Sequence, residues 1–237
     1  MIFMNEQNLS IRLHTVGGYV IGDTVADIGT DHAYLPVFLV QNKKCKTAIA
    51  GEVNEGPLSS ARSLINKHEL SSKITAKLGS GLEVLEGENV DTIVIAGMGG
   101  PLITSILDEG KQQLVNVKRL VLQPNVAANH IRKWLFQHQW SLIAEEMVEE
   151  DEHIYEIIVA EPGKPSAMYS DNLEKELWMG PCLLKNKNST FQKKWIREEL
   201  KLEHVRSQIQ QAKKETNKEE KMNEISKRLQ WIKEELS

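Results

Sequence analysis

Asp27, Gly29, Asp31 and His32 stand close together in the segment ADIGTDHAYLP, residues 26–36, at the end of an apolar run. A carboxylate at a strand end and a glycine two residues later suit a ligand that approaches the backbone closely. The segment lacks the G-x-G-x-x-G pattern that holds a dinucleotide pyrophosphate. We therefore expect a ligand site without a pyrophosphate. Taken singly, a helix cap for Asp27 and a structural role for His32 remain open alternatives.

Three further apolar runs end in polar residues or glycines. In AIAGEVNEGP, Glu52 follows the first segment by about one β-α-β step, where an acidic side chain commonly binds two ribose hydroxyls. In KLGSGLEVL, Gly79, Ser80 and Gly81 leave room for an adenine ring against the backbone. In IVIAGMGGP, an uncharged strand runs into glycines. The four ends together predict one composite site.

In this order and at this spacing, the four segments predict the nucleoside and amino-acid site of an enzyme that uses S-adenosylmethionine (SAM). Asp27, Asp31 and the turn amides are expected to bind the ammonium and carboxylate groups of the methionine moiety, and Glu52 the ribose. Residues 80–82 are expected to face the adenine, and nearby anions suit the sulfonium cation. The predicted cofactor-binding residues are Asp27, Gly29, Asp31, His32, Tyr34, Glu52, Val53, Asn54, Gly79, Ser80, Gly81, Leu82, Ala96, Gly97 and Met98.

Alternating strands and helices are predicted to position these residues. Strands are expected over residues 25–28, 48–53, 74–78, 92–96 and 119–123, and helices over 35–40, 57–68, 101–114 and 127–139, with a short helix within 5–20. This alternation favours an α/β fold with a parallel sheet covered by helices on both faces. Residues 141–148 and 153–161, separated by EEDE, predict an antiparallel hairpin at the sheet edge.

The sequence EPGKPS, residues 161–166, is typical of a linker. It predicts a catalytic domain over residues 1–161 and a helical domain over 162–237. Apolar residues within 191–212 and 222–236 have coiled-coil spacing, and their phase is lost near residues 213–220. The break favours an antiparallel helical hairpin, whereas one continuous helix used for dimerisation is the alternative.

Composition is ordinary for a globular protein, with 237 residues, 41% hydrophobic and 26% charged. The sequence has no apolar run of about 18 residues, so we expect no membrane span. Its start lacks a basic region followed by an apolar one, so we expect no secretory signal. Cys45 and Cys182 lie far apart, so we expect a cytoplasmic protein without a thiolate metal site. Residues 1–160 carry 13 basic and 20 acidic side chains and residues 161–237 carry 16 and 13, so the tail is the better candidate for a polyanion.

The segments ADIGTDHAYLP, IAGEVNEGP, GSGLEVL, IVIAGMGGPLI and LQPN together resemble the bacterial TrmK family. The resemblance extends through IRKWL, EEDEHIYEIIVAE and WMGPCLLK, and so covers nearly the whole chain from Met4. It implies a Rossmann-like class I methyltransferase domain with a mostly parallel seven-stranded sheet and a C-terminal coiled-coil domain. It also implies SAM as the donor, S-adenosylhomocysteine as the product, and N1 of adenine 22 in tRNA as the acceptor.

Asp31, His32 and Asn125 are the polar residues that we expect nearest the target adenine, and Asn125 is equally well explained as a turn residue. AGMGGP offers no carboxylate that would serve as a base at N6. The candidate tRNA-binding residues are Arg132, Lys133, Lys193, Lys194, Arg197 and Lys201. No obligate protein partner is evident from the sequence. Methylation of another RNA base or a small molecule, a nicotinamide dehydrogenase and an inactive SAM-binding protein remain the alternatives.

Overall fold

The structure is a computed structural model that describes residues 9–211 and 217–237. The chain divides into two compact units, residues 1–182 and 183–237. Within the described ranges, no helix is long and apolar enough to cross a membrane.

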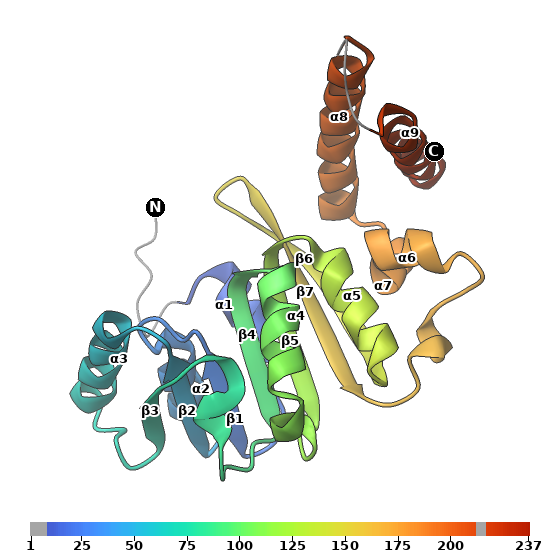
Figure 1. Cartoon of the computed structure of the whole chain (residues 1–237). Coiled ribbons are helices and arrows are strands. Elements are labelled where there is room, and N and C mark those ends of the chain that lie inside the picture. The colour runs from blue at the N-terminus through green and yellow to red at the C-terminus, as the bar shows by residue number, and fades with distance from the viewer. Residues whose placement is uncertain (1–8, 212–216) are drawn as a thin grey trace. The chain divides into compact units, whose positions relative to one another are not determined.

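The first unit is built on one seven-stranded sheet (Figure 1). The strand order is β3-β2-β1-β4-β5-β7-β6, and β1 to β5 are parallel. Strand β7 runs antiparallel between β5 and β6, so the predicted edge hairpin is confirmed, with its second strand inside the sheet. The strands are β1 (Thr24–Ile28), β2 (Thr47–Glu52), β3 (Ile74–Leu78), β4 (Thr92–Gly99), β5 (Arg119–Val126), β6 (Trp140–Glu150) and β7 (His153–Pro162).

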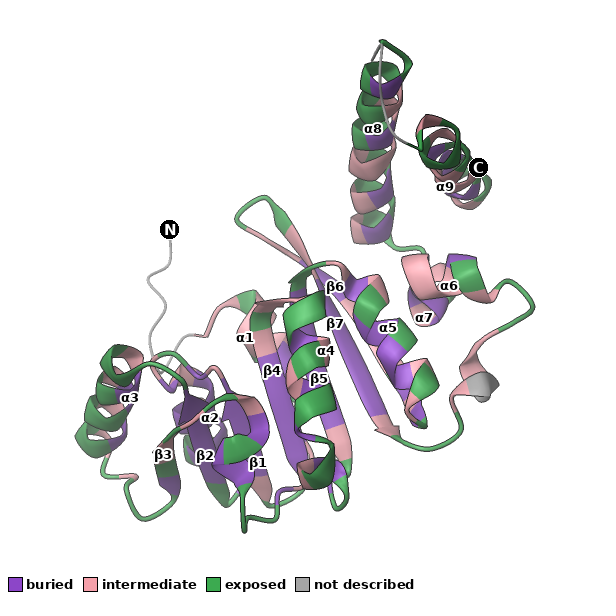
Figure 2. Cartoon of the chain, viewed as in Figure 1, coloured by how far each residue is buried: buried purple, intermediate pink, exposed green. Residues whose placement is uncertain are grey.

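Helices cover both faces of this sheet, as the alternation predicts. Ile93 and Ile95 of β4 belong to one apolar cluster and Val94 between them to the other, because successive side chains of a strand point to opposite faces. The central strands are accordingly buried on both sides (Figure 2). The first cluster includes residues of η1 (Gly81–Leu85), η2 (Lys111–Leu114), α4 (Gly100–Glu109) and α5 (Ala128–Gln137), and the second includes residues of α1 (Ile11–Gly18), α2 (Tyr34–Gln41) and α3 (Glu55–Lys67).

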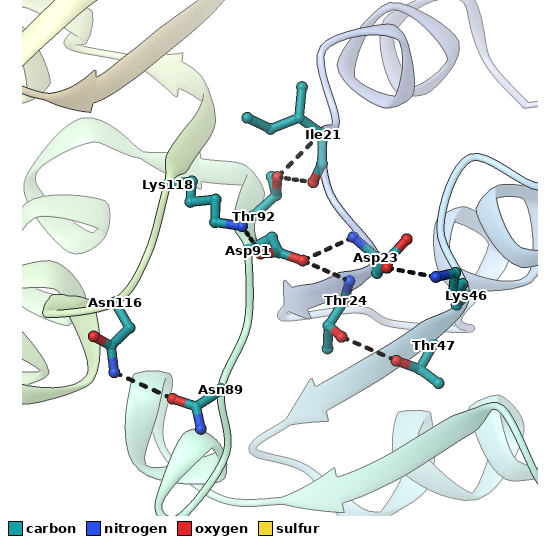
Figure 3. A network of polar contacts seen from close by, with 10 residues as sticks. All are labelled: Ile21, Asp23, Thr24, Lys46, Thr47, Asn89, Asp91, Thr92, Asn116 and Lys118. Carbon is teal, nitrogen blue, oxygen red and sulfur yellow. Dashed lines mark hydrogen bonds and ion pairs between the residues drawn. The ribbon is translucent and has the colours of Figure 1, made fainter.

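The amino ends of the strands are joined by a polar network around Asp91 (Figure 3). Asp91 Oδ2 accepts hydrogen bonds from the backbone N–H groups of Asp23 at 2.7 Å and Thr24 at 3.1 Å, and Lys118 Nζ lies 2.7 Å from Asp91 Oδ1. The hydrogen bond from Lys118, and then that from Thr24, hold the pKa of Asp91 below its ordinary value. This network lies at the opposite end of the strands from the predicted site.

The first unit extends about twenty residues beyond the predicted boundary at 161–162. The added elements are η3 (Pro165–Met168) and α6 (Leu173–Met179), which pack against α5, while η3 also contacts β6. Arg132 of α5 donates hydrogen bonds to the backbone oxygens of Leu177 and Trp178, and so attaches α6 to the sheet unit. The EPGKPS sequence is therefore not a linker between units, because its residues end β7 and begin η3, and the segment after it has partners on α5.

The second unit holds two helices, α8 (Ser189–Gln211) and α9 (Lys218–Leu236), after the short α7 (Pro181–Lys185) that crosses the boundary. Lys187 pairs with Glu235 at 2.7 Å, and Lys218 Nζ donates to the Gln210 backbone oxygen at 3.0 Å. Contacts at both ends make the helices antiparallel, in agreement with the predicted hairpin. The predicted break over 213–220 lies partly outside the described residues. The buried residues of the hairpin include Phe191, Trp195, Leu202, Ile209, Ile225, Leu229, Trp231 and Ile232.

Candidate functional site

A cavity of about 330 Å³ lies at the carboxyl ends of β1, β4 and β5. The strand order reverses between β1 and β4, and open α/β sheets bind their ligands at this switch point. Most of the lining comes from the segments that the sequence singles out, with additions from α1 and β7. The lining residues are Arg12, Leu13, Asp27, Gly29, Thr30, Asp31, Tyr34, Leu35, Ala96, Gly97, Asn125 and Tyr155.

The turn after β1 has a left-handed backbone at three positions, with φ of +74° at Gly29, +56° at Asp31 and +60° at Ala33. At Gly29, a Cβ would lie 2.2 Å from Met98 Cε, so glycine allows this close approach. The Gly29 and Thr30 N–H groups donate to the Gly51 oxygen at 2.9 and 3.0 Å. These two of the turn amides are therefore used within the protein.

Asp27 is buried at the floor of this site, with an exposed fraction of 6%. The Thr30 hydroxyl donates to Asp27 Oδ2 at 2.7 Å. Burial raises the pKa of the Asp27 carboxyl to about 6, with the Thr30 hydrogen bond and the charge of Arg12 acting in the opposite direction. A carboxylate held in this way is stabilised by an added cation.

Glu52 lies at the end of the neighbouring strand β2 and is also buried. Its Oε1 accepts hydrogen bonds from the backbone N–H groups of Val53 at 2.9 Å and Asn54 at 3.1 Å. Its Oε2 accepts a longer bond of 3.3 Å from the Asp31 N–H, which links Glu52 to the turn after β1. The glutamate is thus oriented by the backbone and connected to the cavity lining.

A third polar group comes from the LQPN segment at the end of β5. The buried Gln123 accepts hydrogen bonds at Oε1 from Arg12 and, at 3.1 Å, from the Gly97 N–H. Gln123 Nε2 donates to Asn125 Oδ1 at 3.3 Å, and Asn125 Nδ2 donates to the Gly97 oxygen at 2.8 Å. The network orients the exposed Asn125 at the edge of the cavity.

Several predicted cofactor residues lie beside the cavity rather than in its lining. His32 lines a neighbouring hollow with residues of α3, including Ser59 and Ser63, and this hollow shares Tyr34 with the cavity. Val53 is largely exposed, and Met98 packs on the apolar cluster. The Gly79–Leu82 segment forms the turn into η1, where Ser80 and Glu83 make a capping box.

The Leu82 side chain is buried in the core against Gly110, so only the backbone of this residue can face the adenine expected at residues 80–82. Its aliphatic side chain contributes to apolar packing, and only its backbone is available to a ligand.

The predicted phosphate contact of Arg132 is wrong. Arg132 is fully buried and forms ion pairs with Glu145 and Glu156 in the first unit. These carboxylates raise the pKa of Arg132 against the opposing effect of burial. Its neighbour Lys133 is exposed, because it points away from the sheet. Lys193 and Lys201 are exposed on α8, and Lys194 and Arg197 are half-buried there.

Arg12, Thr30, Gln123 and Tyr155 were not predicted as site residues. Thr30 and Gln123 lie inside the segments singled out above, so their polar type was an available signal. Arg12 and Tyr155 come from α1 and β7, and the Arg12 guanidinium carbon lies 5.3 Å from the centroid of the Tyr155 ring. The pairing of β7 beside β5 places Tyr155 at the cavity, and the packing of α1 against β5 and β6 places Arg12 there.

The strand order, the antiparallel β7 and the acidic cavity at the switch point define a Rossmann-like class I methyltransferase. A sequence model of the TrmK family, described as tRNA (adenine(22)-N(1))-methyltransferase, matches residues 25–234. The tRNA (adenine(22)-N(1))-methyltransferase of Bacillus subtilis strain 168 is 45% identical over 98% of this chain and 98% of that protein. The chain belongs to the TrmK family, which confirms the resemblance drawn from its motifs.

Solved structures agree with this assignment. The crystal structure of the B. subtilis M1A22 tRNA methyltransferase TrmK matches with a TM-score of 0.91 at 44% identity, covering 97% of this chain and 99% of that chain. A Streptococcus pneumoniae protein in complex with S-adenosyl-L-methionine matches with a TM-score of 0.86 at 39% identity, covering 97% of this chain and 100% of that chain. The agreement extends over both compact units.

Proposed function

We propose that this chain transfers the methyl group of SAM to N1 of adenine 22 in tRNA. The observation that carries the proposal is the cavity at the switch point, where Asp27, Asp31 and Asn125 meet at the ends of parallel strands. The family supplies the tRNA position. The SAM complex of the S. pneumoniae relative supports the identity of the donor.

The residues around the cavity fit SAM. An ammonium group beside Asp27 favours the charged carboxylate that burial disfavours. Glu52 Oε2 has room for further donors beside the Asp31 N–H, because a carboxylate oxygen accepts more than one hydrogen bond. These donors would be the ribose hydroxyls. Gly97, with φ of +81°, provides a wall without a side chain on which the ligand lies against backbone.

When bound, SAM supplies a methyl group on a positively charged sulfur, which leaves as a neutral thioether. Adenine N1 carries a lone pair at neutral pH, so no residue of the chain has to remove a proton before the attack. The residues of the cavity therefore act by orientation, which contributes on the order of 7–11 kcal/mol to reactions of this kind.

Asn125 is the residue we assign to the target base. Its Nδ2 donates to Gly97 and its Oδ1 accepts from Gln123, so the amide plane is held in one orientation. An amide oxygen has two acceptor positions, and the second can accept a hydrogen bond from the adenine N6 amino group. The N6 proton released after methylation passes to water in this scheme. His32 lies toward α3, which argues against a direct role at the base.

The basic residues of α8, together with Lys133, are assigned to tRNA phosphates. N1 lies on the Watson–Crick edge, so the adenine has to leave any pairing before it reacts. We place the reaction in the cytoplasm, which is supported by the two free cysteines, Cys45 and Cys182.

The direct test is to incubate the protein with methyl-labelled SAM and an unmodified tRNA transcript that has adenine at position 22. Digestion and mass spectrometry of the nucleosides should detect 1-methyladenosine. The same transcript with guanine at position 22 is the matched control and should acquire no label. Label in the control transcript, or in a nucleoside other than 1-methyladenosine, would contradict the proposal.

A further inference from the structure

Three exposed apolar residues lie where β5 ends and α4 begins. Val126, the last residue of β5, is 66% exposed, and Leu102 in the first turn of α4 is 54% exposed. Pro101 precedes Leu102 and is also exposed. Single exposed apolar residues are normal on a protein surface, whereas a contiguous group of them indicates a binding surface.

The three residues form one surface because the two segments meet at Gly99. Gly99 at the end of β4 pairs with Val126 of β5. A Cβ on Gly99 would meet both Val126 Cγ2, at 3.7 Å, and Pro101 Cδ, at 3.8 Å. Both side chains therefore border the same glycine, and Leu102 directly follows Pro101. We call Pro101, Leu102 and Val126 the apolar platform.

The apolar platform adjoins the residue assigned to the target base. Asn125 lines the cavity and immediately precedes Val126. The Asn125 amide donates to the Gly97 oxygen, whereas Val126 lies against Gly99. Consecutive strand residues are about 3.3 Å apart along the strand, close to the spacing of about 3.4 Å between stacked bases. A base next to an adenine at Asn125 therefore comes within reach of the platform.

The chemistry of the platform identifies the part of RNA that fits it. Residues 92–107 and 120–129, which include the platform, contain no charged side chain. These segments therefore lack a side chain that attracts a phosphate by its charge. The faces of nucleobases are the apolar part of RNA, and proteins pack apolar and aromatic side chains against them. A base face is the group that the platform matches.

We propose that the apolar platform packs against the base directly before or directly after the target adenine in tRNA, and so positions the adenine edge at the cavity. This inference rests on the proposed function. Contact with the neighbouring base restricts the motion of the target adenine, and such restriction is how positioning accelerates a reaction.

The first part of the test changes the platform. Val126→Ser together with Leu102→Ser should lower kcat/KM for tRNA by about 5- to 50-fold, because the base loses its apolar contact. Affinity for S-adenosylhomocysteine, measured by calorimetry, should be retained. The salt dependence of tRNA binding should also be retained, because no phosphate contact is lost.

The second part changes the tRNA. Two transcripts lack the base directly before or directly after the target adenine but keep the sugar and phosphate. The unmodified protein should methylate one of them about 5- to 50-fold less efficiently than the complete transcript. The double Ser variant should lose little more activity with that transcript, because both changes remove the same contact.

Two further proteins control the experiment. Val126→Ile together with Leu102→Met keeps the surface apolar and should retain most of the activity. Val115→Ser is the matched control, because Val115 is 80% exposed and lies before β5, at the other end of the sheet. Its kcat/KM should be unchanged.

Unchanged kcat/KM in the double Ser variant would overturn the proposal. Independent losses from the protein change and from each base removal would do the same. A shift of the double Ser variant from dimer to monomer in size-exclusion chromatography would assign the platform to a second copy of this chain and also overturn the proposal. Absence of methylation by the unmodified protein would instead overturn the proposed function, and this inference with it.

Discussion

The most informative single residue is Asp27, because the same burial that places it at the site also costs stability. Its pKa of about 6 means that the folded protein holds this proton to higher pH than the unfolded chain, in which an aspartate titrates near ~4. The folded state binds more protons in that window, so the Asp27 contribution to stability falls as pH rises from about 4 to about 6. Above about pH 6, the loss of folding stability caused by the charged Asp27 no longer changes with pH.

Asp27→Asn should therefore stabilise the protein without ligand at pH 7.5 by on the order of 1–3 kcal/mol. At pH 4.5 the difference should shrink, because both side chains are then neutral. The same variant should bind S-adenosylhomocysteine more weakly, since the ammonium loses its anionic partner. Thermal melts at the two pH values and calorimetry check both parts, and a destabilised variant at pH 7.5 would refute the first.

Asn125 should affect catalysis more than donor binding. Asn125→Ala removes one hydrogen bond to the N6 amino group, which is worth about 1 kcal/mol or more, so kcat/KM for tRNA should fall by roughly tenfold. Affinity for S-adenosylhomocysteine should be retained. Asn116→Ala removes an asparagine that bonds Asn89 at the other end of the sheet and is the control for activity. Unchanged turnover in the Asn125 variant would exclude this role.

At the level of elements, Arg132 joins α5 to β6, β7 and α6. Its partners Glu145 and Glu156 are buried, so removing the arginine leaves two carboxylates uncompensated. Arg132→Met should lower the free energy of unfolding by about 3–5 kcal/mol. Lys133→Gln, one residue away and exposed, should leave stability unchanged and weaken tRNA binding. Denaturant unfolding and filter binding measure the two effects, and a stable Arg132 variant would contradict the structural assignment.

The start of α4 depends on Gly100, beside the site. A Cβ at Gly100 would lie 2.1 Å from the Ala127 backbone oxygen, whereas a Cβ at Gly99 would meet Val126 Cγ2 at an ordinary 3.7 Å. Gly100→Ala should lower the free energy of unfolding by about 1–3 kcal/mol, because the backbone at Ala127 cannot move away from the added methyl group as a flexible side chain could. Its melting temperature should fall by roughly 3–10 °C. Gly99→Ala is the adjacent control with little expected change, and equal melting temperatures of the two variants would refute the argument.

For the whole molecule, we expect α8 of the second unit to bind tRNA and the first unit to bind SAM. Changing Lys193, Lys194, Arg197 and Lys201 to Gln should weaken tRNA binding and reduce its dependence on salt, because each lost phosphate contact lowers the slope by about 0.9 or less. Affinity for S-adenosylhomocysteine should stay the same. The charge-matched control changes Lys218, Lys221, Lys227 and Lys233 of α9. An equal effect of both sets would show non-specific attraction in place of a site on α8.

Much of the site was predictable because its signals are local. The apolar run before Asp27, the glycine after it and Glu52 one β-α-β step later depend only on neighbouring residues. Strands that alternate with helices then bring their carboxyl ends to one edge. The same local logic placed Asn125, whose segment directly follows the buried part of β5.

The residues that the sequence analysis assigned wrongly or overlooked have a common cause, which is burial by distant segments. Arg132 and Lys133 are adjacent and both basic, and only the packing of α5 on β6, β7 and α6 decides that one is buried and the other exposed. Leu82 likewise takes a core position because η1 lies under α4. A side chain's burial depends on distant segments, so its residue type does not reveal it.

The amino-acid sequence alone determined the alternating elements, the acidic strand ends and the helical hairpin, since hydrophobic periodicity and turn residues act over short distances. Tertiary structure alone decided that β7 inserts beside β5, that residues 163–182 pack with the sheet, and that Arg12 meets Gln123 across 111 positions of the chain. These outcomes depend on which distant segments bury apolar surface against each other. The free energy of that burial is gained only when the whole chain folds.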